Sequence, residues 1–400
     1  MKIYEIGTGY TPIPAQMGAA TEIVVEELTK AMLKQGHDVQ IVDIKATDRR
    51  ETDLPILEVP VAAVFSGTDV ALGIMHKLKR VGYSVSLAGV LKKILQAADE
   101  KVIFHFHNQY NLFFFLKLIP ATLRRKCLIA YTNHSGIWRL EWSEIKSIIK
   151  KRYFQEVECM KQADLVFLLN EETKRNVLEH LGIHEGRIMV INNGVNIDVY
   201  HPLTKEEKCS AREKWGLCGK HVILQVGSVY ENKGQLRSAE YLLPLLKTNP
   251  HLVYAYVGGI VDVAYQTQIQ NFVRENSMMS QIRYLGTVSP GRELNELYNT
   301  AAATILPSRY EGFSLVSIES CASGVPVLVD RMGPVRLGKG SVIYDSRYIK
   351  DAVTQVILDS IADDGHLGTE ARNNAVDNYS WDRIAAGYVG AFENATADRG

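Results

Sequence analysis

Short apolar runs along the chain alternate with segments in which apolar residues recur every three or four positions. Near the N-terminus, "KIYEIGTG" predicts a strand that ends in a glycine turn, and "DVQIVDI" predicts the next strand. The segment between them, from about Gly18 to Gly36, predicts an amphipathic helix with an apolar stripe of Ile23, Val24, Leu28, Ala31 and Met32. Such an alternation indicates a parallel sheet with helices on both faces.

The same alternation stops at a turn-rich stretch, "INNGVNIDVYHP" (residues 191–202), and then restarts. Strands are predicted before it at "KVIFHFH", "CLIAYTNH" and "ADLVFLL", and after it at "HVILQVGS", "HLVYAYVGG", "QIRYLGT", "AAATILPS" and "GVPVLVD". We therefore predict an α/β fold of two doubly wound Rossmann-like domains that face a cleft, at residues 1–195 and 196–380. A last helix over residues 381–396 is expected to pack back on the first domain.

Composition narrows the classes of function. The chain has 400 residues, 46% of them apolar, with 45 acidic and 45 basic side chains. This balance gives no electrostatic footprint for nucleic acid, and no window reaches the ~20 apolar residues of a membrane-spanning helix. The N-terminal apolar run is broken too early by Gly and Pro for a secretory signal. Five scattered cysteines without a C-x-x-C pair favour a reducing cytoplasm over a disulfide framework.

Candidate chemistry lies in "PSRYEGFSLVSIESCASGVPV" (residues 307–327), where Glu311 and Glu319 stand eight positions apart. A helix is predicted to begin near Phe313 or Ser314, so the free backbone N–H groups of Gly312, Phe313 and Ser314 lie between the two carboxylates. A helix start of this kind binds anions or polyols. On spacing alone, a solvated loop residue and a capping residue remain an equally good interpretation of the two glutamates.

The stretch resembles the E-x(7)-E motif of family 4 glycosyltransferases, which are retaining enzymes with the GT-B fold. Three other segments are similar to landmarks of that family: "GHDVQIV", "GRIMVINNGVNIDVYHP" and "VILQVGSVYENKG". The segment from "IRYLGTVSPG" to "ESCASGVPVL" follows the family through nearly every landmark. The resemblance covers most of the chain and is strongest over residues 190–330.

The resemblance implies a role for each matching position. Glu319 matches the glutamate that binds the ribose of the donor nucleotide, and Glu311 matches the one that contacts the donor sugar. Lys233 matches the lysine that neutralises the diphosphate as charge builds on the leaving group. Gly18 matches a glycine that lies against the phosphates, and His107 matches a histidine that faces the donor sugar. The implied donor-binding set is Gly18, Ser228, Lys233, Arg309, Glu311, Gly312, Phe313, Ser314, Leu315 and Glu319.

The chain departs from the family pattern at three positions. Ser228 replaces an arginine that would add a second cation at the diphosphate, so either Arg309 or another basic residue compensates for it or the donor is bound more weakly. Met17 replaces the first of two paired glycines, and Asn192 replaces the hinge proline. Of the three departures, Ser228 has the largest expected effect on the catalytic rate, because it removes a positive charge at the leaving diphosphate.

The histidines of the first domain raise a separate question. His105 and His107 are two apart on a strand and share a face, but a metal site would need a third ligand that the pattern does not reveal. We therefore expect His105 to be a core residue and no metal to be bound. His134 and Asn108 are expected on the acceptor side.

Taken together, the sequence predicts a retaining hexosyl- or N-acetylhexosaminyl-transferase of polysaccharide biosynthesis. It would use a nucleotide-sugar, in the first place a UDP-sugar, and would need no metal or other cofactor because Lys233 and a helix start replace the metal. The acceptor would be a glycan, a lipid-linked glycan or a small molecule, held by the first domain between residues 65 and 142. Nothing in the sequence specifies the oligomeric state.

Basic clusters in this region, "HKLKR", "LRRKC" and "KKRYF", lie near the apolar run "LFFFLKL". They suggest peripheral contact with an anionic membrane surface, although a solvated helix face is the better interpretation of each cluster alone. "GTGYTP" lacks the third glycine of a dinucleotide fingerprint, which argues against an oxidoreductase. A nucleotide-sugar epimerase and a non-catalytic glycan- or nucleotide-binding protein remain alternatives.

Overall fold

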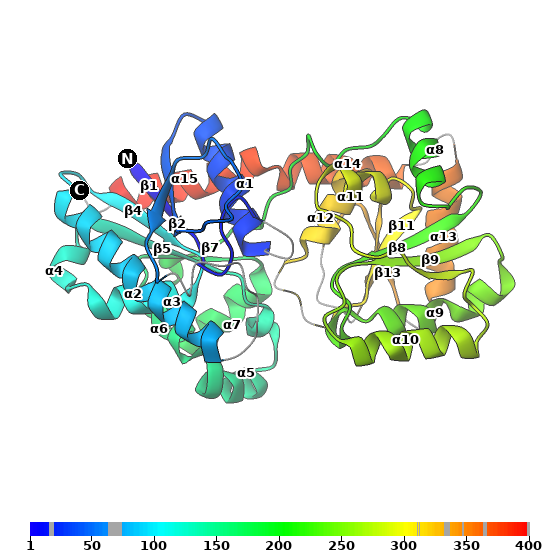
Figure 1. Ribbon diagram of the computed structural model, residues 1–400, viewed down its shortest axis with the longest axis horizontal. Coiled ribbons are helices and arrows are strands. Elements are labelled where there is room, and N and C mark those ends of the chain that lie inside the picture. The colour runs from blue at the N-terminus through cyan, green and yellow to red at the C-terminus, as the bar shows by residue number, and fades with distance from the viewer. Residues whose placement is uncertain are drawn as a thin grey trace. The chain divides into compact units, whose positions relative to one another are not determined.

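Two parallel sheets form the framework of the chain in the computed structural model (Figure 1). The structure describes residues 1–15, 20–62, 74–309, 311, 313–331, 337–345, 348–362 and 366–397. The chain divides into unit 1, Met1–Gly194 with Trp381–Gly400, and unit 2, Val195–Ser380. Gly18 and Gly312 of the implied donor site, and Met17 beside the first, lie outside the described residues.

The sheet of unit 1 has seven parallel strands in the order β3-β2-β1-β4-β5-β6-β7. They are β1 (Lys2–Ile6), β2 (Asp38–Ile44), β3 (Ile56–Val59), β4 (Val102–Phe106), β5 (Cys127–Asn133), β6 (Leu165–Leu168) and β7 (Ile188–Val190). The predicted strands of this half are present. The short edge strands β3 and β7 were not predicted.

Helices cover both faces of this sheet, which confirms the predicted doubly wound fold. They are α1 (Ala20–Lys34), α2 (Ile74–Ala97), α3 (Gln109–Leu118), α4 (Ala121–Arg124), α5 (Trp142–Ile148), α6 (Phe154–Gln162), α7 (Glu171–Leu181) and α15 (Trp381–Ala397). Apolar residues of α1 and α15 pack against one face, and those of α2, α3 and α6 pack against the other. The C-terminal helix α15 therefore completes unit 1, and Lys34 of α1 forms an ion pair with Asp382 of α15 at 2.7 Å.

The sheet of unit 2 has six parallel strands in the order β10-β9-β8-β11-β12-β13. They are β8 (His221–Val226), β9 (Leu252–Val257), β10 (Ile282–Tyr284), β11 (Ala303–Leu306), β12 (Val327–Asp330) and β13 (Ser341–Tyr344). The first five match predicted strands, and β13 was not predicted.

The helices of unit 2 also lie on both faces of their sheet. They are α8 (Lys205–Lys214), α9 (Gln235–Thr248), α10 (Val263–Glu275), α11 (Arg292–Tyr298), α12 (Leu315–Ala322), α13 (Ile349–Ile361) and α14 (Leu367–Tyr379). Helices α11, α12 and α14 share one apolar cluster with the sheet, while α9, α10 and α13 share the other. Both units thus have the sandwich of helices and parallel sheet that the alternating pattern predicted.

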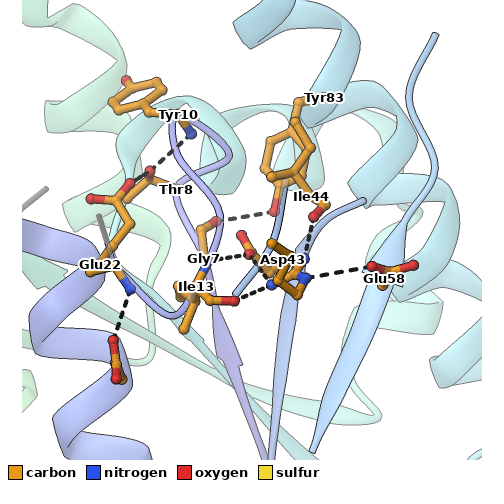
Figure 2. Close-up of polar contacts among 12 residues, drawn as sticks. Gly7, Thr8, Tyr10, Ile13, Glu22, Asp43, Ile44, Glu58 and Tyr83 are labelled. Atoms are coloured by element: carbon orange, nitrogen blue, oxygen red, sulfur yellow. Dashed lines mark hydrogen bonds and ion pairs between the residues drawn. The ribbon is translucent and has the colours of Figure 1, made fainter. Parts of the chain in front are cut away.

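A group of buried polar contacts fixes the loop that follows β1 (Figure 2). Asp43, at the end of β2, accepts hydrogen bonds from the backbone N–H of Ile13 at 2.8 Å and from Arg49 at 3.0 Å. Burial raises the pKa of Asp43 to about 6, and the Ile13 and Arg49 donors oppose this shift. Glu22 of α1 accepts a hydrogen bond from the hydroxyl of Thr8 in the same loop. These contacts hold the loop against β2 and α1 at the carboxyl edge of the sheet.

Candidate functional site

The strand order reverses direction once in each sheet, between β1 and β4 in unit 1 and between β8 and β11 in unit 2. The connections on the two sides of such a point go to opposite faces, which leaves the loops at the carboxyl ends open to a ligand. Residues that follow β8 and β11 form the candidate site of unit 2. Residues on or after β1, β4 and β5 form the corresponding group in unit 1.

An ion pair between Lys233 and Glu311 joins the two loops at the reversal point of unit 2. The Nζ atom of Lys233, after β8, lies 2.5 Å from Oε1 of Glu311, after β11. Both side chains are mostly covered, with exposures of 23% and 14%, so solvent screens the pair less than it would a surface pair. The two residues that the sequence singled out for the diphosphate and the sugar are thus brought together.

Backbone contacts position this ion pair. The N–H of Arg309 donates to the carbonyl of Asn232 at 3.0 Å, and Arg237 of α9 donates to the carbonyl of Pro307 at 2.8 Å. Gly234 has a φ of 73°, and a Cβ on it would lie 3.1 Å from Pro307. The loops after β8 and β11 are therefore held against each other by main-chain contacts, and glycine is needed where they meet.

Glu319 lies in the second turn of α12 and points into unit 2. Its carboxylate accepts a hydrogen bond from the hydroxyl of Tyr298 at 3.0 Å. The side chain keeps partial contact with solvent. Burial nevertheless raises the pKa of Glu319 to about 7, and hydrogen bonds from Tyr298 and Tyr200 oppose this rise. Glu319 is therefore a carboxyl group that exchanges its proton near neutral pH, in a position where a ligand hydroxyl could donate to it.

Helix α12 begins as the sequence predicted. Ser314 is its N-cap, and the side chain of Ser314 accepts a hydrogen bond from the backbone N–H of Ser317. Phe313 packs against Tyr379 with ring centroids 5.8 Å apart, and Leu315 packs against the core of unit 2. The hydroxyl of Ser314 thus satisfies an N–H group inside the helix, and the side chains of Phe313 and Leu315 support the helix start.

Ser228 follows Gly227 directly after β8. The two chain segments at the ends of β8 and β9 approach so closely that a Cβ on Gly258 would lie 2.1 Å from the carbonyl oxygen of Gly227. The side chain of Gln235 donates to the carbonyl of Ser228 at 3.0 Å. Arg309, which could have compensated for the missing arginine, forms an exposed ion pair with Glu231 at 2.9 Å. Lys233, which is less exposed than Arg309, is therefore better placed than Arg309 to bind a diphosphate.

A chain of hydrogen bonds runs through the group in unit 1. Glu5, the last residue but one of β1, lies beside His105 in the register of β1 with β4. The Nδ1 atom of His105 is 3.0 Å from one carboxylate oxygen of Glu5, and Nε2 of His107 is 2.7 Å from the other. Nδ1 of His107 is 3.0 Å from Nε2 of His134, and Nε2 of His105 is 2.7 Å from the hydroxyl of Thr132.

Glu5 supplies the third potential metal ligand that the sequence pattern did not reveal. Ligand atoms of Glu5, His105 and His107 all lie within 4.8 Å of one another. However, both carboxylate oxygens already accept from the histidines, and the other nitrogen of His105 pairs with Thr132. Hydrogen bonds alone therefore satisfy these buried groups, and His105 is the core residue that we expected, with 0% exposure.

The remaining residues assigned to the acceptor side differ in how far contacts within the protein already occupy their side chains. Asn108 caps α3 through its side-chain oxygen, and its amide nitrogen donates to the hydroxyl of Tyr10 at 2.9 Å. In the basic cluster at the start of α2, Lys79 is buried, and Arg80 lies over the ring of Tyr10 at 4.4 Å. His134 is half-buried at the carboxyl end of β5. Asn108 uses both its side-chain oxygen and its side-chain nitrogen within the protein, whereas only Nε2 of His134 has a described hydrogen-bond partner. His134 is therefore the better candidate for contact with a ligand.

Comparison with known proteins identifies the family. The profile described as Glycosyltransferase Family 4 matches residues 21–199, and the profile described as Glycosyl transferases group 1 matches residues 208–360. The chain belongs to the family 4 glycosyltransferases. The paired profiles cover both units, as the resemblance over most of the chain predicted.

Relatives of this glycosyltransferase differ in how much they share with it. A D-inositol 3-phosphate glycosyltransferase of Nocardiopsis dassonvillei is 32% identical over 194 residues, which is 44% of this chain and 42% of that protein. An uncharacterised glycosyltransferase of Methanocaldococcus jannaschii is 25% identical over 99% of this chain and 98% of its own. The first match thus spans less than half of each chain, whereas the second spans almost all of both.

Solved structures share the fold of this glycosyltransferase. Sucrose-phosphate synthase from Thermosynechococcus elongatus superposes with a TM-score of 0.76 at 19% identity, over 100% of both chains. HepE from Anabaena, solved in complex with UDP and glucose, has a TM-score of 0.70 at 14% identity, over 98% of this chain and 99% of that one. Within the described residues of this chain, no helix combines the length and apolarity needed to cross a bilayer.

We predict that Glu319 makes the stability of unit 2 depend on pH. The folded state keeps a proton up to about pH 7 that the unfolded chain loses near pH 4.5. Unfolding free energy should therefore fall as the pH rises from 4.5 to 7, by at most about 3 kcal/mol. Glu319→Gln removes this loss, so the variant should melt at a higher temperature than the wild type at pH 8 and at a similar temperature at pH 5.

Thermal unfolding of both proteins at the two pH values measures this effect. Glu370→Gln, an exposed substitution on α14 of the same unit, is the matched control. A variant E319Q that is equally or less stable than the wild type at pH 8 would show that the carboxylate is not held at an energetic cost.

Proposed function

We propose that this chain is a retaining glycosyltransferase that moves a hexosyl or N-acetylhexosaminyl group from a UDP-sugar to an acceptor hydroxyl. The observation that carries the proposal is the ion pair of Lys233 and Glu311 at the reversal point of the unit 2 sheet. Such a point is where open parallel sheets bind nucleotides. A cation and a carboxylate held together there suit a ligand with an anionic diphosphate and a sugar rich in hydroxyl groups.

Lys233 supplies the positive charge that the reaction needs. When the bond between the anomeric carbon and the diphosphate breaks, negative charge develops on the leaving phosphate. A fixed ammonium group near that phosphate stabilises the transition state more than the ground state. The ammonium group takes the role that a divalent cation would have, so we propose transfer without a metal ion. Because Ser228 is uncharged and Arg309 pairs with Glu231, most of this stabilisation falls to Lys233.

Glu311 and Glu319 suit two different parts of the donor. Ligand-free Glu311 pairs with Lys233, so the donor would replace one ionic partner on each side: the diphosphate at Lys233 and sugar hydroxyls at Glu311. Glu319 accepts a hydrogen bond from Tyr298 and has no ion pair with Lys233 among the described contacts, and a vicinal diol such as ribose can donate to its carboxylate. HepE, which shares the fold, has been solved with UDP and with UDP-glucose, and this supports a uridine nucleotide as the first donor to test.

The acceptor side of the proposal rests on unit 1. Helix α2 exposes Leu78, Val81 and Val85 on one face, each of them more than 40% exposed. An exposed apolar stripe with nearby lysines supports contact with a membrane surface and hence a lipid-linked glycan as acceptor. Co-sedimentation with anionic vesicles should fall strongly in a V81E,V85E double variant, and failure of the wild type to bind such vesicles would remove the lipid-linked class. Free glycans and small molecules would then remain.

The other functions considered receive less support. An epimerase would act on the donor alone, whereas the family is one of glycosyl transfer. A non-catalytic binding protein would have no need to keep the Lys233–Glu311 pair. The cysteines at all five positions are free, which supports the reducing cytoplasm that we assign to the protein.

We predict that Glu311→Ala separates catalysis from nucleotide binding. Loss of the carboxylate should lower the transfer rate by about 10²-fold or more, because Glu311 contacts the sugar. The affinity for UDP should stay the same or increase, because Lys233 loses its competing partner. Product formation from a UDP-sugar panel measures the first effect, and calorimetric titration with UDP measures the second.

Glu275→Ala is the matched control, since Glu275 is exposed on α10 of the same unit. Unchanged transfer in the E311A variant would remove Glu311 from the reaction. A UDP affinity reduced as strongly as the transfer rate would assign Glu311 to nucleotide binding instead.

We also predict that UDP binding releases a proton near neutral pH. Ribose hydroxyls donate to the ionised form of Glu319 and therefore lower a pKa that burial has raised to about 7. Titration at pH 6.5 in buffers of different ionisation enthalpy should give a binding heat that varies with the buffer. This variation should be smaller in E319Q, where only the terminal phosphate of UDP, with a pKa of about 6, still releases a proton; equal variation in the wild type and E319Q would contradict the placement of ribose at Glu319.

A further inference from the structure

The segment of residues 196–203, near the start of unit 2, is fastened to α11 by buried hydrogen bonds. Asn295 accepts from the backbone N–H of His201 at 3.2 Å. Asn299 accepts from the backbone N–H of Leu203 at 2.9 Å. Both asparagines are only 2% exposed. The segment contains no helix or strand, so these side chains supply the partners that its backbone would otherwise lack.

Arg372 of α14 holds the same segment against the end of α12. Its Nη1 atom donates to the carbonyl of Tyr200 at 2.7 Å and to the carbonyl of Ala322 at 2.8 Å. Its Nη2 atom donates to the carbonyl of Ile197 at 3.2 Å. Ala322 is the last residue of α12, the helix that carries Glu319. Because the guanidinium group is planar and rigid, it fixes the main chain at Tyr200 relative to this helix.

The side chain of Tyr200 connects two parts of the nucleotide side of unit 2. The ring lies beside that of Tyr298, with centroids 6.1 Å apart, and is 6% exposed. The hydroxyl oxygen accepts from the backbone N–H of Gly291, the N-cap of α11, at 3.1 Å. The hydroxyl proton is donated to the carboxylate of Glu319. The N–H of Gly291 occupies one side of the oxygen and so leaves the proton for Glu319.

Glu319 thus receives two hydrogen bonds from within the protein. Tyr298 donates at 3.0 Å from α11, and Tyr200 donates from the segment of residues 196–203. An ionised carboxylate has about four acceptor sites, so two of them stay available, as many as a vicinal diol uses. Donors favour the ionised form of a carboxyl group over the protonated form. Both tyrosines therefore support the form of Glu319 that a diol can bind.

Other ionisable groups around α12 do not compete for this role. Among the described residues, only burial and the two tyrosine hydroxyls affect the pKa of Glu319. The acids of α11 pair with Lys214 of α8, the arginine of α14 binds carbonyl groups, and the acids of α14 are exposed. Burial raises the pKa values of the cysteine of α12 and the tyrosine of α14, so both are uncharged near neutral pH. These groups are Glu293, Glu296, Cys321, Glu370, Arg372, Asp377 and Tyr379.

We propose that Tyr200 is a positioning residue for the nucleotide: the N–H of Gly291 orients its hydroxyl, and this hydroxyl fixes the carboxylate of Glu319 in the direction and charge state that bind a vicinal diol. Tyr200 acts through Glu319 and not on the ligand itself. That the diol is the ribose of the donor rests on the proposed function, whereas the link between Tyr200 and Glu319 does not. Because unit 2 begins at Val195, the chain connection between the units contributes a residue to the nucleotide site.

Thermal unfolding of the ligand-free protein tests the link itself. Tyr200→Phe keeps the ring but removes the hydroxyl, so the ionised carboxylate loses a donor and its pKa rises. A raised carboxyl pKa costs stability at pH values above it, and the cost grows with the rise. Relative to the wild type, Y200F should therefore lose about 2–4 °C more in melting temperature at pH 8.5 than at pH 5.

The extra loss at pH 8.5 should vanish when both proteins carry E319Q. This background keeps His201, the ionisable neighbour of Tyr200 in the sequence, and so removes only the contribution of Glu319. An equal loss at the two pH values in the absence of E319Q would show that Tyr200 acts by packing alone and would overturn the proposal.

A measurement on the unmodified ring covers the case in which Y200F does not fold. In protein labelled with ¹³C at the ζ carbon of tyrosine, the NMR signal of Tyr200 should titrate with a midpoint near pH 7, the pKa of its acceptor Glu319. The same signal should lose this step in E319Q. A Tyr200 signal that is unchanged between pH 5.5 and 8.5 in the wild type would overturn the proposal.

Titration with UDP tests the consequence for the ligand. Y200F should bind UDP about fivefold more weakly than the wild type at pH 7, and the two affinities should converge toward pH 9, where Glu319 is ionised in both. The ionisation of UDP itself is common to both proteins and cancels in their ratio. A ratio that does not change with pH would contradict the positioning role.

Tyr265→Phe is the matched control. Tyr265 is also a buried tyrosine of unit 2, and its hydroxyl accepts from the backbone N–H of Leu236 at 3.0 Å. Any effect of Y265F on the affinity for UDP should be the same at pH 7 and pH 9. A wild type that binds no UDP, together with the expected melting and NMR results, would instead count against the proposed function alone.

Discussion

The parallel pairing of the strands, with one reversal of strand order in each sheet, decides where chemistry can occur in this protein. All strands of a parallel sheet end at the same edge, and a reversal opens that edge to a ligand. The reversal lies between β1 and β4 in unit 1 and between β8 and β11 in unit 2. The Glu5–His107–His134 chain and the Lys233–Glu311 pair lie at these two places. The same topological rule therefore generates both groups, although their chemistry differs.

The charged side chains at the two sites differ in whether a ligand can replace their hydrogen-bond or ionic partners. In unit 1 the carboxylate of Glu5 is surrounded by donors, so the charge is satisfied within the protein and fixes the orientation of neighbouring rings. In unit 2 the pair of Lys233 and Glu311 leaves each charge with a partner that a ligand can replace, and Glu319 is held at a raised pKa of about 7. Functional sites commonly contain groups with such perturbed pKa values. Unit 1 thus has a fixed network of hydrogen bonds around Glu5. In unit 2, Lys233, Glu311 and Glu319 are groups whose ionic partner or proton a ligand can replace.

The two sheets and the two glutamates of the site in unit 2 could be predicted from the sequence, because each depends on a local pattern or a motif. The strand–helix alternation gave both sheets, and the E-x(7)-E motif pointed to Glu311 and Glu319. Glu5 was missed because its partners depend on the register of β1 with β4, which no local pattern contains. The sequence did contain one indication of a buried polar site, namely the charged residue Glu5 inside the apolar strand "KIYEI". The edge strands β3, β7 and β13 were missed because each has only three or four residues, too few for a clear period.

The central claim is that Lys233 binds the diphosphate of a nucleotide donor at the carboxyl edge of unit 2. The most direct measurement is the affinity of UDP compared with that of uridine, by calorimetry, for the wild type and for Lys233→Met. Methionine keeps the length and apolar stem of lysine but has no charge. The account predicts that the wild type binds UDP at least about tenfold more tightly than uridine and that the variant binds the two about equally. A variant that keeps the full preference for UDP would contradict the claim.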